Sequence, residues 1–205
     1  MRTVAVIDYG MSNIDSVVRA LTECGGKPFV ASKPSTLTQA DSIVLPGVGA
    51  FADGMRELHK RGFDDAIRTE AIENRIPVLG VCLGMQMLAS HGDEGGDTPG
   101  LGLIDGRVTR LSGPGGSERI PHVGWNGVIP QQDCPLMRGI QPGSDFYFVH
   151  SYHLQCAHDG NAVARTDYCG GFTSVVRRDY IFGVQFHPEK SQKLGLMLLR
   201  NFLSV

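Results

Sequence analysis

The chain has 205 residues, of which 41% are hydrophobic and 20% are charged, and its formal net charge is −2 at pH 7. A chain of this length and composition is typical of one globular domain with a sizeable buried core, so we expect residues 1–205 to form a single domain. Because acidic and basic residues nearly balance, we expect neither nucleic acid nor an anionic membrane as a partner.

No apolar run approaches the length of a membrane-spanning helix. Met1-Arg2-Thr3 leads directly into an apolar, strand-like run without the pattern of a signal peptide. The five cysteines, which are Cys24, Cys82, Cys134, Cys156 and Cys169, have neither paired nor metal-ligand spacing. We therefore expect reduced thiols, a cytoplasmic location, and neither a metal nor a cofactor.

Predicted strands and helices alternate in the first half of the chain. Apolar, often β-branched runs predict strands at residues 3–8, 27–31, 42–45 and 77–82, and helical spacing predicts helices at 14–21, 51–58, 63–71 and 85–90. Asn13 stands where it would cap the first helix, and Gly25-Gly26 would end it. This alternation favours an α/β fold with a doubly wound, mostly parallel sheet and helices on both faces.

The second half of the chain lacks this alternation. Residues 92–102 are expected to form a loop, and Gly124-Trp125-Asn126 a turn. Short runs at 106–111, 145–149, 153–156, 162–165, 172–177 and 181–186 predict antiparallel strands, and a helix is predicted at 192–203. Gly113, Gly115 and Gly116 lack the strand-to-helix context of a phosphate-binding loop, so we do not expect nucleotide binding.

Cys82 lies in the most informative stretch, Gly80-Val81-Cys82-Leu83-Gly84-Met85-Gln86. This is a G-x-nucleophile-x-G pattern, in which a strand turns sharply into a helix and presents the middle side chain. Such a turn needs small neighbours, which Gly80 and Gly84 provide. The helix N-terminus favours a negatively charged sulfur and places backbone N–H groups beside it. Cys82 is therefore a candidate nucleophile.

An apolar, strand-like run ends at His187, and Pro188 forces an extended turn before Glu189. Residues two apart across such a turn can approach each other, so Glu189 would accept a hydrogen bond from the His187 ring and fix its orientation. Taken alone, the pair is also compatible with a capping histidine and a surface carboxylate before the last helix. Together with the upstream cysteine, it predicts a Cys82–His187–Glu189 catalytic triad.

Pro46-Gly47-Val48-Gly49 follows a predicted strand, at the edge where doubly wound sheets bind ligands. The glycines around Val48 let the backbone rotate, so that the N–H of Val48 or Gly49 would face a developing oxyanion. A plain turn between a strand and a helix would have the same sequence. The N–H of Leu83, directly after the candidate nucleophile, would be the second oxyanion donor.

Together these stretches resemble the class I glutamine amidotransferase family, whose members carry the same cysteine elbow and a late His-Pro-Glu. Residues 8–13, 45–51, 124–126, 148–152 and 185–191 are similar to the glutaminase subunits of imidazole glycerol phosphate synthases, and the similarity runs from Val4 to Phe202. The resemblance implies that Cys82 attacks the carboxamide of glutamine while His187 transfers protons. A γ-glutamyl thioester would form and be hydrolysed to glutamate, after ammonia has left.

The same resemblance implies that Gln86, Ser151 and Tyr152 bind the amino-acid end of glutamine. It implies a heterodimer with a (β/α)8 synthase subunit that receives the ammonia and makes imidazole glycerol phosphate and aminoimidazole carboxamide ribonucleotide in histidine biosynthesis. The Pro46–Gly49 segment would be badly oriented until that partner binds its own ligand. Trp125 is the predicted interface anchor, and the further interface candidates are Tyr147, Asn13 and Pro121.

Other functions stay open at this point. Ser12, Val123 and His153 depart from residues usual in that group of subunits, and similar glutaminase subunits serve sugar amidotransferases in surface-polysaccharide synthesis. A cysteine peptidase or esterase on a related fold is more remote, because it would not need Gln86 to bind a free amino acid. A binding module without activity is disfavoured by the intact candidate triad.

Overall fold

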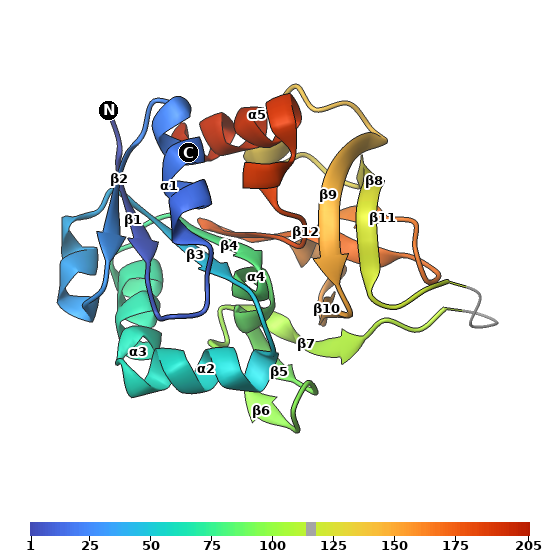
Figure 1. Ribbon diagram of the computed structural model, residues 1–205, viewed down its shortest axis with the longest axis horizontal. Helices are drawn as coiled ribbons and strands as arrows, with labels where there is room; N and C mark the ends of the chain where they lie inside the picture. Colours follow the sequence, from blue (N-terminus) through green and yellow to red (C-terminus); the bar gives the residue numbers. More distant parts are fainter. Residues whose placement is uncertain (114–117) are drawn as a thin grey trace.

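The computed structural model describes residues 1–113 and 118–205, so Gly115 and Gly116 lie outside the described residues. Within the described residues, the larger sheet has nine strands in the order β2-β1-β3-β4-β13-β12-β11-β8-β9 (Figure 1). Its parallel strands are β2 (Lys27–Ala31), β1 (Thr3–Ile7), β3 (Ser42–Gly47), β4 (Val78–Cys82) and β13 (Ile181–Val184). Because parallel strands end at the same edge, the segments that follow β3, β4 and β13 meet there.

The rest of this sheet is antiparallel and consists of β12 (Phe172–Arg178), β11 (Ala162–Thr166), β8 (His122–Pro130) and β9 (Ser144–His150). A smaller sheet contains β10 (Tyr152–Cys156), β7 (Ile104–Arg110), β5 (Ala89–Gly92) and β6 (Thr98–Pro99). A parallel first half followed by antiparallel strands confirms the predicted fold class.

Helices cover both faces of the parallel half (Figure 1). α1 (Ile14–Glu23) and α5 (Gln192–Leu203) lie on one face, and α2 (Phe51–Lys60), α3 (Phe63–Arg68) and α4 (Leu83–Met87) lie on the other. Short 3-10 helices span Pro34–Gln39, Pro135–Met137, Asp159–Asn161 and Pro188–Lys190, and a π turn spans Thr69–Glu73. Within the described ranges, no helix is long and apolar enough to cross a membrane.

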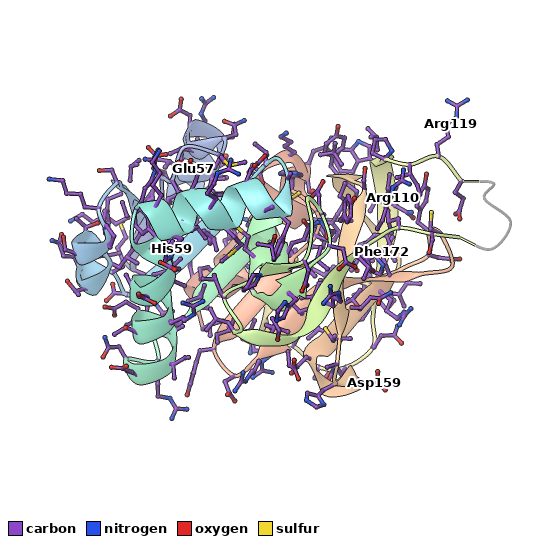
Figure 2. All side chains as sticks on the ribbon, turned by 90° about the horizontal axis from the view of Figure 1, so that it is seen from below. Glu57, His59, Arg110, Arg119, Asp159 and Phe172 are labelled. Carbon is purple, nitrogen blue, oxygen red and sulfur yellow. The ribbon has the colours of Figure 1, made fainter. Side chains whose placement is uncertain are left out.

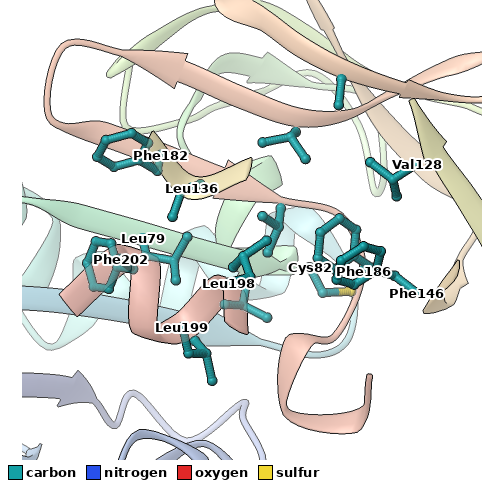
Figure 3. Packing of buried hydrophobic residues seen from close by; sticks show 14 of the residues in the cluster. Leu79, Cys82, Val128, Leu136, Phe146, Phe182, Phe186, Leu198, Leu199 and Phe202 are labelled. Carbon is teal, nitrogen blue, oxygen red and sulfur yellow. The ribbon is translucent and has the colours of Figure 1, made fainter. Parts of the chain in front are cut away.

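The inner parallel strands β1, β3, β4 and β13 are largely apolar because both of their faces are buried, whereas the edge strand β2 begins at the exposed Lys27. In β1, Val4 and Val6 join the cluster that contains Phe202 of α5 (Figure 3), whereas Ala5 and Ile7 join the cluster under α2 and α3. All four of these β1 side chains are fully buried. The alternation along each strand therefore divides the core into two layers, one on either side of the sheet.

Some predicted boundaries are wrong. The helix after Cys82 spans Leu83–Met87 and does not reach Ser90, because residues 89–92 form β5 and pair with β7. The helix predicted at 63–71 changes to a π turn after Arg68. Asn13 directly precedes α1, but its side chain makes no capping hydrogen bond.

The predicted turn at Gly124-Trp125-Asn126 is also wrong. These three residues lie inside β8 and pair with Phe148, Tyr147 and Phe146 of β9. Glycine and asparagine are typical of turns, and the two glycines of β8 also lower its local strand preference. Pairing with strand β9 overrides that local preference.

We predict that Gly84→Ala lowers the free energy of unfolding by about 2–3 kcal/mol, because a Cβ there would collide with the Leu45 carbonyl group of β3. Gly160→Ala is the matched control, since a Cβ at Gly160 meets nothing within 4 Å, and it should change stability by less than about 0.5 kcal/mol. Urea unfolding measures both variants. Equal stability of Gly84→Ala and the unsubstituted protein would contradict this packing.

Candidate active site

Cys82 ends β4 and directly precedes α4, with φ 54° and ψ −111°. A residue other than glycine rarely adopts this conformation, and it persists only where the surroundings enforce it. A Cβ on Gly80 would lie 2.6 Å from the Gly84 carbonyl oxygen, so the turn closes only with glycine. Cys82 is 7% exposed and belongs to the core cluster that contains Phe186 (Figure 3). The strained turn therefore holds a nearly buried thiol at the edge of the sheet.

His187 follows β13 and is anchored to β9. Its N–H donates to the Tyr147 carbonyl at 2.9 Å, and its own carbonyl accepts a hydrogen bond from Ser191 Oγ at 2.6 Å. The ring Nδ1–H donates to Oε1 of Glu189 at 2.8 Å, and both side chains are at least 95% buried. Nε2 of His187 has no hydrogen-bond partner among the described residues. The ring is thus oriented at one nitrogen and free at the other.

Two neighbours determine the charge of His187. Burial opposes the imidazolium form, but the Cys82 sulfur and the Glu189 carboxylate together raise the pKa of His187 to about 9. The imidazolium form is therefore favoured at neutral pH.

A pocket of about 350 Å³ brings most of the predicted site residues together. The predicted residues that line it are Val48, Gly49, Cys82, Leu83, Gln86, Pro121, Ser151, Tyr152 and His187. Glu189 does not line the pocket but is bonded to His187. Trp125, Tyr147 and Asn13 do not line the pocket. Among the residues that the structure describes, no group of histidine, cysteine and acidic side chains is arranged to hold a metal ion.

Gln86 lies on α4 and is 4% exposed, so it is not an exposed residue of the first helical turn. Its Nε2 donates to the Tyr152 carbonyl at 2.9 Å and to Oε1 of Gln185 at 3.1 Å. Nε2 of Gln185 in turn lies 3.8 Å from the Cys82 sulfur. With both of its amide hydrogens donated inside the protein, Gln86 can offer only its carbonyl oxygen to a molecule in the pocket.

Sequence reasoning missed Gln185 and three residues of the pocket wall, Glu94, Val149 and His150. Glu94 comes from the polar segment expected to be a loop, and its Oε2 accepts the Phe51 N–H at 3.0 Å. Burial raises the pKa of the Glu94 carboxyl group. The sequence offered one signal for two of these residues, which is their position beside predicted site residues. Gln185 lies two positions before His187, and His150 lies one position before Ser151.

The predicted oxyanion donors differ in their availability. Gly49 has φ +114°, which only glycine adopts freely, and Leu83 is the first residue of α4, where an N–H has no acceptor within the helix. The Val48 N–H, however, donates to the Met11 carbonyl at 2.8 Å. In this conformation Val48 therefore has no N–H free for a ligand.

The remaining predicted residues lie on the surface. Trp125 is 48% exposed, and its ring stands edge-on to that of Tyr147, with the ring centroids 6.0 Å apart. Val123 and Val149, which pair across β8 and β9, are 57% and 37% exposed. Asn13 is exposed in the connection before α1. Trp125, Tyr147, Val123 and Val149 thus form an apolar surface on the strand pair that ends the larger sheet.

Comparison with known proteins agrees with this geometry. Residues 5–205 match the family model described as glutamine amidotransferase class-I. The chain is 48% identical to imidazole glycerol phosphate synthase subunit HisH of Symbiobacterium thermophilum over 98% of this chain and 93% of that protein. It is 46% identical to the subunit of the same name from Moorella thermoacetica, over 98% and 94%.

A solved structure described as a glutamine amidotransferase is 20% identical and covers 98% of this chain and 97% of its own, with a TM-score of 0.77, which supports the fold. The match to the family model and the full-length similarity to two curated subunits identify the chain as a member of the class I glutamine amidotransferase family, in the group of proteins named imidazole glycerol phosphate synthase subunit HisH.

Proposed function

We propose that the chain is the glutaminase subunit of imidazole glycerol phosphate synthase and hydrolyses glutamine to glutamate and ammonia. The observation that carries this proposal is one pocket that joins Cys82, Gln86 and a His187 ring bonded to Glu189. The ammonia passes to a (β/α)8 synthase subunit, which makes imidazole glycerol phosphate and aminoimidazole carboxamide ribonucleotide in histidine biosynthesis. The free cysteines are typical of a protein in the reducing cytoplasm, which is the location that we propose.

The reaction begins when the Cys82 sulfur attacks the side-chain carbonyl carbon of glutamine. Before this attack the thiol proton has moved to Nε2 of His187, which gives the imidazolium form, and the other ring nitrogen is held by Glu189. The carbonyl oxygen becomes an oxyanion next to the Leu83 N–H, which follows the nucleophile in the chain. The imidazolium then gives its proton to the leaving nitrogen, so ammonia departs and a γ-glutamyl thioester remains on Cys82.

Hydrolysis of the thioester uses the same residues in reverse. His187, now neutral, takes a proton from water, and the water oxygen attacks the thioester carbonyl. The second oxyanion collapses and the carbon–sulfur bond breaks, and the proton taken from water stays on His187 beside the released sulfur. Glutamate leaves and the enzyme is restored. Because the net reaction adds one water to glutamine, these steps need no oxidant or reductant.

Polar groups on the pocket wall provide the binding site for the amino-acid end of glutamine. The free carbonyl oxygen of Gln86 and the Glu94 carboxylate are acceptors for the substrate's ammonium group. Ser151 and Tyr152, where β9 connects to β10, also line the pocket. Because the Glu94 carboxylate can bind a free ammonium group, the pocket favours an amino acid over a peptide or an ester as the substrate. The similarity to HisH subunits favours the synthase over a sugar amidotransferase as the partner.

The bond from the Val48 N–H to the Met11 carbonyl supports partner-dependent activity. An oxyanion needs preorganised donors, and in this conformation one N–H group of the 46–49 segment is already hydrogen-bonded to a carbonyl of the protein. We infer that binding of the synthase subunit rotates the segment and frees an N–H of Val48 or Gly49. The partner would contact the apolar surface of Trp125 and Tyr147, and its footprint would also include Asn13 and Pro121.

Cys82→Ser should reduce glutaminase kcat by at least about a thousandfold, because a hydroxyl group is a much weaker nucleophile at neutral pH. Cys24→Ser, on a half-buried thiol outside the pocket, is the matched control and should keep full activity. Release of glutamate and ammonia is measured for both variants. Activity retained by Cys82→Ser would remove Cys82 from its proposed role.

Glu189→Gln should destabilise the protein more at pH 6 than at pH 9.5, by roughly 1 kcal/mol. The pKa of His187 is raised to about 9 from 6.5. Its contribution to stability is therefore fully present below about pH 6.5 and is lost as the pH rises through about 9. Urea unfolding at the two pH values measures this, with the exposed Glu73→Gln as control. Equal destabilisation at both pH values would contradict the ion pair.

The chain alone should be a poor glutaminase. Adding a (β/α)8 synthase subunit loaded with its ligand should raise kcat by about a hundredfold or more, which is the size of effect expected from gaining one oxyanion donor. A steady-state glutaminase assay with and without the loaded partner measures this. A turnover rate that no such partner changes would overturn the proposed coupling but not the glutaminase chemistry.

A further inference from the structure

Two buried histidines beside the pocket take no part in the steps above. His150 is the last residue of β9 and lines the pocket, and His122 is the first residue of β8 and pairs with it in register. They are 6% and 3% exposed, and Nδ1 of His122 lies 3.1 Å from Nε2 of His150. Burying two imidazole rings side by side is costly unless their nitrogens are hydrogen-bonded.

The hydrogen-bond partners determine which nitrogens carry protons. Nδ1 of His150 lies 2.8 Å from the Tyr152 carbonyl, which can only accept, so this nitrogen is the donor. In a neutral ring, Nε2 of His150 is then an acceptor, and Nδ1 of His122 must donate to it. Burial lowers the pKa of His150 to about 3 and that of His122 to about 4, so both rings are neutral near pH 7. The hydrogen bonds of the pair therefore run in one direction, from His122 to His150 and from His150 to the Tyr152 carbonyl.

The chain of hydrogen bonds continues in both directions. Nδ2 of Asn126, on β8, lies 3.4 Å from Nε2 of His122. The Tyr152 carbonyl accepts a second hydrogen bond, from Nε2 of Gln86, which also bonds Gln185. The same carbonyl thus joins the histidine pair to the side chain proposed to bind glutamine.

Aromatic packing fixes both rings in place. The His122 ring stacks between Tyr168 and Phe148, with centroids 4.0 Å and 4.9 Å away. The His150 ring stands edge-on to Phe172, 4.8 Å between centroids. Phe172 is itself 1% exposed and lies in the antiparallel half of the molecule (Figure 2). Neither ring can turn without disturbing this aromatic packing, so the bond to the Tyr152 carbonyl has a fixed direction.

We propose that His122 and His150 are positioning residues, which as a neutral hydrogen-bonded pair hold the Tyr152 carbonyl, and through it the Gln86 amide, in the orientation that binds glutamine. This inference rests on the proposed function, because it deepens the account of the same pocket. It predicts that loss of the pair weakens binding of the amino-acid end and leaves the reactivity of the Cys82 sulfur intact.

The test uses the full chain and 6-diazo-5-oxo-L-norleucine, a glutamine analogue that alkylates nucleophilic cysteines. Mass spectrometry of the peptide with Cys82 gives the labelling rate at each analogue concentration. His150→Phe keeps the ring but removes both hydrogen bonds, so the half-saturating concentration should rise about tenfold while the maximal rate changes by less than about twofold. Iodoacetamide, which has no amino-acid end, should label this variant and the unsubstituted protein at the same rate.

Three further variants separate positioning from packing. His150→Asn restores a donor near the position of Nδ1 and should bring the half-saturating concentration back to within about threefold. His122→Phe keeps the stacked ring but removes the donor to His150, so the half-saturating concentration should rise about threefold. This variant decides the test if His150→Phe does not fold. His153→Phe is the control, since His153 is 8% exposed and also contacts Phe172, but its Nδ1 has no partner among the described residues.

An unchanged half-saturating concentration in folded His150→Phe and His122→Phe would overturn the positioning role. An equal rise in His153→Phe would also overturn it, because the effect would then come from packing around Phe172. If the analogue does not label Cys82 of the unsubstituted protein in a saturable manner even when the loaded synthase subunit is present, the proposed function itself fails, so the two failures are distinguishable.

Discussion

At Cys82 the chain turns from β4 into α4 with φ of 54°, and the geometry of the pocket follows from that turn. Gly80 and Gly84 let two backbone segments and the Leu45 carbonyl come into contact, which no side chain at either glycine would allow. The tight contact presents the thiol at the edge where β3, β4 and β13 end together. The strand order of the sheet therefore delivers the nucleophile, the 46–49 segment and His187 to one place.

The histidines near this turn differ in charge because their partners differ. His187 faces the Cys82 sulfur and donates to the Glu189 carboxylate, and these neighbours outweigh burial and raise its pKa to about 9. His150 and His122 are bonded to a carbonyl and to each other, so burial dominates and lowers the pKa of each. Burial alone does not determine the charge of a histidine. A titrating ring suits proton transfer, and a permanently neutral pair suits fixed hydrogen bonds.

The parallel half of the fold could be predicted because its strands are short apolar runs bounded by glycine and separated by helical spacing. β8 could not, since Gly124, Asn126 and Gly127 favour turns and only pairing with β9 makes them a strand. Cys82, His187 and Glu189 could be singled out because a tight turn and an i, i+2 pair are local in sequence. Glu94 and His150 reach the pocket, and Gln185 reaches Gln86, through tertiary contacts. The bond from the Val48 N–H to Met11 joins segments that are far apart in the chain.

Catalysis by Cys82 requires a covalent bond between its sulfur and the γ-carbonyl group of glutamine. The most direct measurement is mass spectrometry of the protein quenched with acid during turnover of glutamine, followed by digestion. The account predicts the added mass of a γ-glutamyl group on the peptide that contains Cys82, which hydroxylamine removes as expected for a thioester. Glutamate release from a protein in which no cysteine ever carries that mass would contradict it.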